Sequence, residues 1–125
     1  MSANIILTTG VYDLIKDQIK RKKFTKEQEE ILLEKLKITQ QVLRRELPTD
    51  VVALERKIHV KDHSTSEEMN FLLVGPKAAK VSKNKFSVLS DVGVATVGYK
   101  IGDVIQWPTE KGTKQYEILH VEPNV

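Results

Sequence analysis

A change in hydrophobic spacing at Pro48 limits the folds that this chain can adopt. Before Pro48, apolar residues recur at steps of three and four, which is the spacing of an amphipathic helix. After it, stretches such as KIHV alternate apolar and polar residues, which is the spacing of a half-buried strand. We therefore predict an α+β protein in two parts, a helical part over residues 1–47 and a β domain over residues 48–125.

Two antiparallel helices account for the first part. We predict one helix over residues 9–22 and a second over residues 26–46, joined by two or three residues. Thr25 and Gln28 have the spacing of a capping box at the start of the second helix, and Pro48 prevents that helix from continuing. The prediction is a helical hairpin, a short coiled coil, whose tip is the segment KRKKFTKE.

The second part carries the signals of a small antiparallel sheet. Strands are predicted over residues 51–62, 69–75, 85–90, 103–108 and 114–123. Residues 91–98 are too short and too rich in glycine for a long helix, so one or two helical turns are predicted there. Lys111-Gly112 supplies the turn signal for the final hairpin.

Composition argues against several kinds of chemistry. The chain has no cysteine, which excludes disulfides, thiolate metal sites and a cysteine nucleophile. The histidines His59, His63 and His120 lack the spacing of a metal site, and neither a nucleophile elbow nor a phosphate-binding glycine loop is present. No apolar run reaches the roughly 20 residues that span a bilayer. We expect a cytoplasmic, non-enzymatic protein without metal, cofactor or membrane partner.

Positive charge is concentrated in the first part of the chain. Residues 1–47 carry ten Lys and Arg against seven Asp and Glu, whereas residues 48–125 carry ten against ten. The hairpin-tip residues singled out are Lys20, Arg21, Lys22, Lys23, Phe24 and Lys26. Two interpretations stay open: a solvated turn that keeps the protein soluble, or a contact with nucleic acid or an acidic protein surface.

Three segments of the second part resemble a known family. FLLVGPKAA, FSVLSDVGVATVGYKIGD and YEILHVE are similar, in this order, to motifs of the C-terminal domain of the bacterial transcription elongation factors GreA and GreB. The resemblance covers about residues 50–122. It implies an FKBP-like domain after a helical hairpin, and binding to RNA polymerase at the rim of its secondary channel.

Two other segments resemble one branch of that family, the Rnk type (regulator of nucleoside diphosphate kinase), whose hairpin is short. NIILTTGVYDLIKDQI is similar to the strand and helix that open this branch. ELPTDVVALERKIHVKD is similar to its segment between the two domains, including Asp50, Val51 and Val52.

The resemblance also implies a polymerase-binding loop. Its residues are Ser87, Leu89, Ser90, Asp91 and Val92. Asp91 stands where the family has proline, so a fixed φ angle is lost and a charge is gained. Two roles for Asp91 stay open: a salt bridge with the polymerase, or the cap of the short helix that follows.

The predicted tip differs from that of the cleavage factors in this family. In those factors, the resemblance implies, acidic residues at the end of a longer hairpin position a second Mg²⁺ in the polymerase active site. Lysines cannot ligate Mg²⁺ and repel it at short range, and a short hairpin does not reach the active site. We therefore expect an elongation regulator that does not stimulate transcript cleavage.

Two alternatives belong to other classes of function. The first is a nucleic-acid-binding module that uses the basic tip, with an affinity that falls steeply with salt. The second is an FKBP-like peptidyl-prolyl isomerase, against which the scarcity of Phe and Tyr and the single Trp107 argue.

Overall fold

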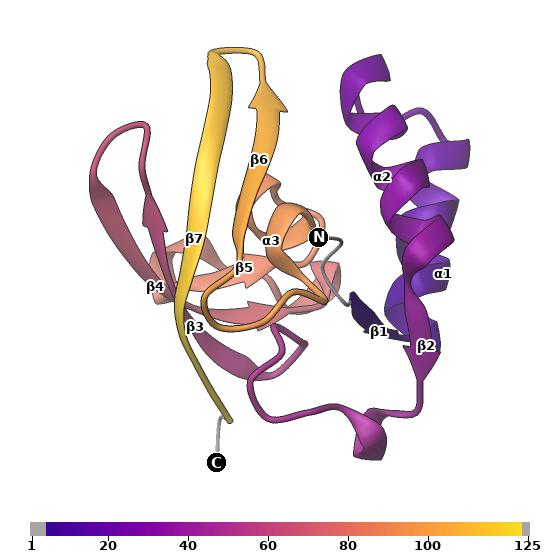
Figure 1. Cartoon of the computed structure of the whole chain (residues 1–125), viewed down its shortest axis with the longest axis horizontal. Helices are drawn as coiled ribbons and strands as arrows, with labels where there is room; N and C mark the ends of the chain where they lie inside the picture. Colours follow the sequence, from indigo (N-terminus) through magenta and orange to yellow (C-terminus); the bar gives the residue numbers. More distant parts are fainter. Residues whose placement is uncertain (1–4, 124–125) are drawn as a thin grey trace. The chain divides into compact units, whose positions relative to one another are not determined.

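The computed structural model describes residues 5–123 (Figure 1). The chain divides into two compact units, Met1–Leu47 and Pro48–Val125. The first contains two of the three α-helices within the described residues, and the second contains a five-stranded sheet. The predicted α+β class is therefore confirmed. No helix within residues 5–123 has the length and apolar character needed to cross a membrane.

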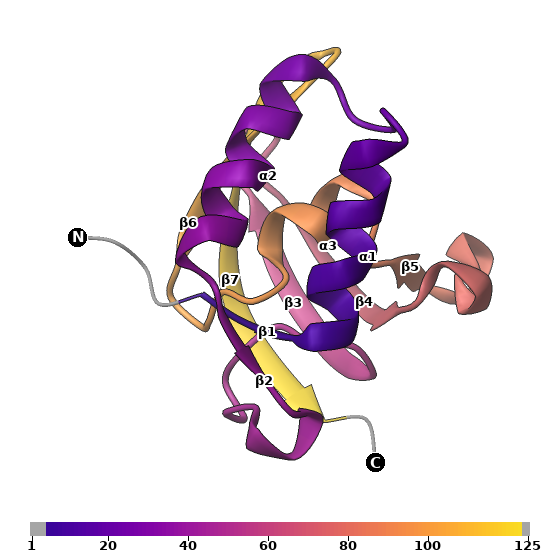
Figure 2. The same cartoon turned by 90° about the vertical axis from the view of Figure 1, so that its right-hand side faces the viewer.

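The first unit combines a small parallel sheet with two helices. Its elements are β1 (Ile6–Thr8), α1 (Thr9–Lys20), α2 (Lys26–Ile38) and β2 (Gln40–Val42). β1 and β2 pair in parallel, and α1 and α2 contact each other (Figure 2). Val11, Ile15 and Ile19 recur at helical spacing along α1 and are buried, as the sequence predicts. Leu32 and Leu36 are the buried leucines of α2.

Local hydrogen bonds define the ends of both helices. The predicted capping box is confirmed: the backbone N–H of Gln28 donates to Thr25 Oγ1 at 3.2 Å, and the N–H of Thr25 donates to Gln28 Oε1 at 3.1 Å. α1 ends two residues earlier than predicted, because Lys22 adopts a left-handed φ of 56°. The N–H groups of Lys22 and Lys23 then close the helix end on the carbonyls of Ile19 and Gln18.

The prediction that the second helix continues to residue 46 is wrong. α2 ends at Ile38, and the N–H of Gln40 donates to the carbonyl of Ile5 at 2.8 Å as β2 joins β1. Arg44–Glu46 forms a separate 3-10 helix, so its arginines do not lie at the end of α2. Pairing with a strand more than thirty positions away overrides the local helical spacing, which a local pattern cannot show.

The sheet of the second unit has the order β5-β4-β3-β7-β6. Its strands are β3 (Arg56–Asp62), β4 (Glu67–Val74), β5 (Lys85–Ser87), β6 (Val104–Thr109) and β7 (Gly112–Pro123). Only the β4–β5 pair is parallel. The five predicted strands and the final hairpin are present, but the first strand begins at Arg56 and the third ends at Ser87, so residues 88–90 are not the predicted strand. The prediction of an antiparallel sheet is wrong for the β4–β5 pair, which is parallel. The residues before Arg56 form only an isolated bridge between Val51 and Lys100.

One face of this sheet is apolar and buried. Ile58 and Val60 of β3 and Phe71 and Leu73 of β4 are at most 3% exposed, and the Phe71 ring stacks on Phe86 with centroids 4.8 Å apart. α3 (Asp91–Thr96) contacts β6 and β7, and five of its six residues are buried. The short helical segment predicted over residues 91–98 is therefore confirmed.

Gly93 of α3 packs directly against the preceding turn. A Cβ atom at this position would lie 2.3 Å from the carbonyl oxygen of Ser87 and 3.0 Å from Ser90 Oγ. A backbone carbonyl cannot move aside as the end of a flexible side chain can, so only glycine fits here. Gly75 is a contrasting case, since a Cβ there meets nothing within 4 Å and its φ is −67°.

We expect Gly93→Ala to lower the free energy of unfolding of the second unit by about 1–3 kcal/mol, as overpacking does. Gly75→Ala, the same chemical change in open space, should alter it by less than about 0.5 kcal/mol. Urea unfolding followed by the fluorescence of Trp107, which is 1% exposed, measures both. Equal effects of the two substitutions would contradict the packing at Gly93.

Lys35 is a buried cation in the first unit. Its side chain is 4% exposed, and burial lowers its pKa from 10.5 to about 7. Between these two values the unfolded chain holds a proton that the folded chain has lost, so the free energy of unfolding rises with pH. Burial raises the pKa of Tyr116 to about 12, so above pH 10 the opposite trend begins.

We expect stability to rise between about pH 7 and pH 10, and Lys35→Met to remove this rise while increasing stability at pH 7. Urea unfolding followed by far-ultraviolet circular dichroism across this range measures the effect. Lys37→Met, on an exposed position of the same helix, is the matched control and should leave the pH dependence intact. A pH dependence unchanged in Lys35→Met would refute the assignment.

Candidate functional site

The predicted polymerase-binding loop is a tight turn between β5 and α3. Ser87 is the last residue of β5, and its carbonyl oxygen accepts hydrogen bonds from the Ser90 backbone N–H at 2.9 Å and from Ser90 Oγ at 2.6 Å. Ser87 Oγ accepts from the N–H of Leu89 at 3.0 Å. The two serines therefore fix the turn from within, while Leu89 is half-buried and Asp91 is exposed.

Ser90, and not Asp91, caps α3. Ser90 Oγ accepts a hydrogen bond from the N–H of Gly93 at 3.2 Å, which is the N-cap interaction. Asp91 is the first residue of the helix, so the proposal that it caps α3 is wrong. Its Oδ1 instead accepts from Nε1 of the buried Trp107 at 2.9 Å. This bond orients the carboxylate of Asp91 at the surface of the loop.

The loop forms one edge of a hollow of about 440 Å³. Ser87, Ser90, Asp91 and Val92 all line it, so the structure brings four of the five predicted loop residues to one place. Leu89 is not among the lining residues. The remaining wall is mainly apolar and comes from β4, β5, β7 and the segment before β5, through Met69, Ala79, Val81, Phe86 and Tyr116. Sequence reasoning missed this wall because its residues lie far apart in the chain.

Two polar groups complete the rim of this hollow. Lys114 Nζ lies 3.3 Å from Asp62 Oδ2. Burial alone would raise the pKa of Asp62, but hydrogen bonds from Ser64 and the Lys114 ammonium outweigh it and lower that pKa. Burial, with the charges of Asp62 and Asp91, raises the pKa of Tyr116 to about 12. At neutral pH the hollow thus has a neutral phenol, one ion pair and the additional negative charge of Asp91.

The predicted tip residues lie between and beside the ends of α1 and α2, in the other unit. Arg21 pairs with Asp17 at 3.0 Å and Lys22 with Glu29 at 3.5 Å. Phe24 is half-buried. The remaining tip cations, exposed and without an ion-pair partner in the described part of the chain, are Lys20, Lys23 and Lys26.

Neither the loop over residues 87–92 nor the hairpin tip resembles a metal centre. Within residues 5–123, no group of three or more His, Cys, Asp or Glu side chains is placed to hold a metal ion. The loop offers hydroxyl, carboxylate and apolar groups for contact with a partner surface, and the tip offers ammonium groups for contact with an anionic one.

Comparison with protein families gives a match to the second unit of the chain. The family model described as "Transcription elongation factor, GreA/GreB, C-term" matches residues 47–123. Transcription elongation factor GreA of Clostridium botulinum strain Langeland is 38% identical over 76 residues, which are 61% of this chain and 48% of that protein. GreA of strain Eklund 17B is 39% identical over 88 residues, 70% of this chain and 55% of that protein. The chain thus spans about half the length of the curated relatives it matches.

A solved structure extends the similarity to both units. The prokaryotic transcription elongation factor GreA/GreB from Nitrosomonas europaea is 26% identical to this chain, with a TM-score of 0.66 over 97% of this chain and 99% of that one. Since the family model also covers well over half of the sequence, this chain belongs to the GreA/GreB family of transcription elongation factors.

Proposed function

We propose that this chain is a regulator of transcription elongation that binds RNA polymerase at the rim of its secondary channel and does not stimulate transcript cleavage. The match of residues 47–123 to the C-terminal domain of the family carries the proposal. Polymerase is then its principal partner, its place is the cytoplasm, and it has no catalytic group of its own. In this proposal α1 and α2 are a shortened form of the family's helical hairpin, and the second unit is its FKBP-like domain.

The loop over residues 87–92 is the proposed docking element. Internal hydrogen bonds of Ser87 and Ser90 hold its backbone before any partner arrives, which limits the entropy lost on binding. The hydrogen bond from Trp107 gives Asp91 a fixed direction. In this proposal the bond replaces the rigidity of the family's proline, and the carboxylate of Asp91 would meet a cation of the polymerase.

The tip explains why docking would not lead to cleavage. A second Mg²⁺ requires oxygen ligands, and the residues from Lys20 to Lys26 include no carboxylate. Three acids lie beside this segment on α1 and α2: Asp17, Glu27 and Glu29. Of these, Asp17 and Glu29 pair with Arg21 and Lys22. The protein would therefore act by occupying the channel entrance, in competition with cleavage factors. The opening strand β1 followed by α1 supports placement in the Rnk-type branch.

A second candidate function is nucleic-acid binding by the tip. It is favoured by one observation, that three of the tip lysines have no ion-pair partner within the described residues. Nucleic-acid affinity that falls steeply with salt and is lost in a Lys20→Gln/Lys23→Gln/Lys26→Gln variant would support it. Polymerase binding through the loop should survive in that variant, which separates the two functions.

We expect Leu89→Asp to weaken binding to core RNA polymerase by about tenfold or more, equivalent to about 1.4 kcal/mol, because it places a charge in the docking surface. Val104→Asp is the matched control, since Val104 is 51% exposed on β6 of the same unit. Surface plasmon resonance with immobilised polymerase measures both, after circular dichroism confirms folding. Equal weakening by the two variants, or an unaffected Leu89→Asp, would refute docking by the loop.

A further inference from the structure

The second unit also contains a cluster of positive charge. Its net charge does not reveal this cluster, because the unit has equal numbers of acidic and basic residues. Residues 69–90 contain no Asp or Glu. The same stretch contains Lys77, Lys80, Lys83 and Lys85. Within residues 5–123, none of these four ammonium groups has an ion-pair partner. An uncompensated cluster of this kind is a site of positive potential.

Two of these lysines face each other across a bridge. The N–H of Lys80 donates to the carbonyl of Lys85 at 2.8 Å, and the N–H of Lys85 donates back to Lys80 at 3.1 Å. Residues paired in this way project their side chains to the same side. Like charges directly opposite each other are destabilising, and an anion bound between them removes the repulsion.

Strand register brings another lysine to the same face. Lys85 of β5 lies opposite Leu72 of β4, and Leu72 lies opposite Lys57 of β3. These three side chains therefore form a row on the sheet face that points away from buried Ile58 and Phe71. Lys57 is exposed and has no ion-pair partner in the described range either. We call Lys57, Lys80, Lys83 and Lys85 the lysine surface.

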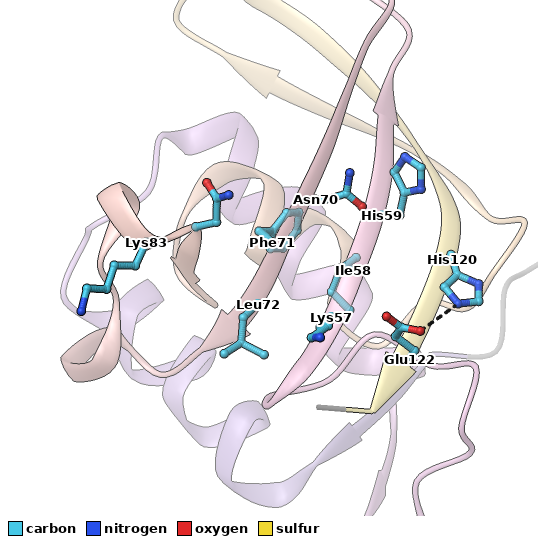
Figure 3. Close-up of a pocket in the computed structure, with 10 residues that line it drawn as sticks. Lys57, Ile58, His59, Asn70, Phe71, Leu72, Lys83, His120 and Glu122 are labelled. Carbon is cyan, nitrogen blue, oxygen red and sulfur yellow. Dashed lines mark ion pairs between the residues drawn. The ribbon is translucent and has the colours of Figure 1, made fainter. Parts of the chain in front are cut away.

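A hollow of about 330 Å³ lies beside Lys57 and Lys83 of this surface (Figure 3). Lys83 lines it from the turn before β5, and Lys57 lines it from β3. The other lining residues include two amide side chains, two imidazoles and an apolar wall, contributed by Asn70, Asn84, His59, His120 and Leu72. Glu122 limits the positive surface at β7, where its carboxylate lies 3.5 Å from His120 Nε2.

We propose that the lysine surface binds single-stranded nucleic acid, with phosphates on the lysines and one base in the hollow. The apolar wall suits the face of a base, and the amides and imidazoles suit its polar edge. A base stacked within a duplex cannot enter the hollow, so a single strand is required. Lys80 and Lys85 do not line the hollow, so a strand with several phosphates can contact more of the lysine surface than one free nucleotide in the hollow can. This inference is independent of polymerase docking by the loop over residues 87–92.

An oligonucleotide-binding assay tests the proposal. The Lys20→Gln/Lys23→Gln/Lys26→Gln variant of the full chain is used, so that the hairpin tip does not contribute. Fluorescence anisotropy of a labelled single-stranded RNA of about 12 nucleotides is measured between about 50 and 200 mM salt. We expect binding that weakens as salt rises. An added Lys83→Gln substitution should lower the slope of log affinity against log salt by about 0.7, because one fewer phosphate is then neutralised.

Charge-matched variants locate the binding surface. Lys80→Glu/Lys83→Glu should weaken binding at least about tenfold, because it reverses two charges of the lysine surface. Lys100→Glu/Lys111→Glu makes the same change in net charge at exposed lysines elsewhere in the unit, and should have little effect. Asn70→Ala should weaken binding several-fold without changing its salt dependence, because it removes a contact to the base.

Three results would overturn the proposal. The first is equal weakening by the two charge-reversed pairs. This would indicate an electrostatic attraction of the RNA to the whole protein and not to the lysine surface. The second is binding of duplex RNA or polyglutamate as tight as that of the single strand. The third is the absence of single-strand binding in a variant that still binds RNA polymerase, which would leave the docking function intact and exclude this one.

Discussion

The close approach of Gly93 to the Ser87 carbonyl is the constraint on which the loop geometry depends. It allows the first turn of α3 to lie against the end of β5. The Ser90 hydroxyl then donates a hydrogen bond to the Ser87 carbonyl and accepts one from the Gly93 N–H, which links the strand end to the helix start. Asp91 follows at the surface, where the Trp107 indole holds its carboxylate. Without this packing the residues of the proposed docking loop would still be present in the sequence, but they would not form one edge of the apolar hollow.

Binding and its consequence are assigned to different units of the chain. In the proposed function, the second unit, which contains the loop and matches the family model, would attach to the polymerase. The first unit contains the tip, whose chemistry would decide in this proposal whether attachment leads to cleavage. On this proposal, a change confined to the tip would alter the effect on transcription while the second unit kept the same fold. Asp17 and Glu29 form ion pairs with the tip cations Arg21 and Lys22, and Glu27 is the one carboxylate within the segment KRKKFTKE.

The sequence predicted features that depend on neighbouring residues and missed those that depend on distant ones. The capping box of Thr25 and Gln28 spans three positions, and the alternation along β3 spans a few more, so both were predicted. The end of α2 depends on pairing between β2 and a strand at the start of the chain. The Asp91–Trp107 bond joins residues 16 positions apart, and the hollows combine several strands, so local patterns do not show them.

Transcript cleavage in backtracked RNA polymerase complexes tests the central claim most directly. Purified chain is added alone, and then at rising concentration together with a GreA protein that stimulates cleavage. The proposed function predicts no cleavage with the chain alone, and a progressive loss of GreA-stimulated cleavage as the chain occupies the polymerase. Cleavage stimulated by the chain itself would show that its cation-rich tip supports the metal chemistry after all, and would contradict the proposal.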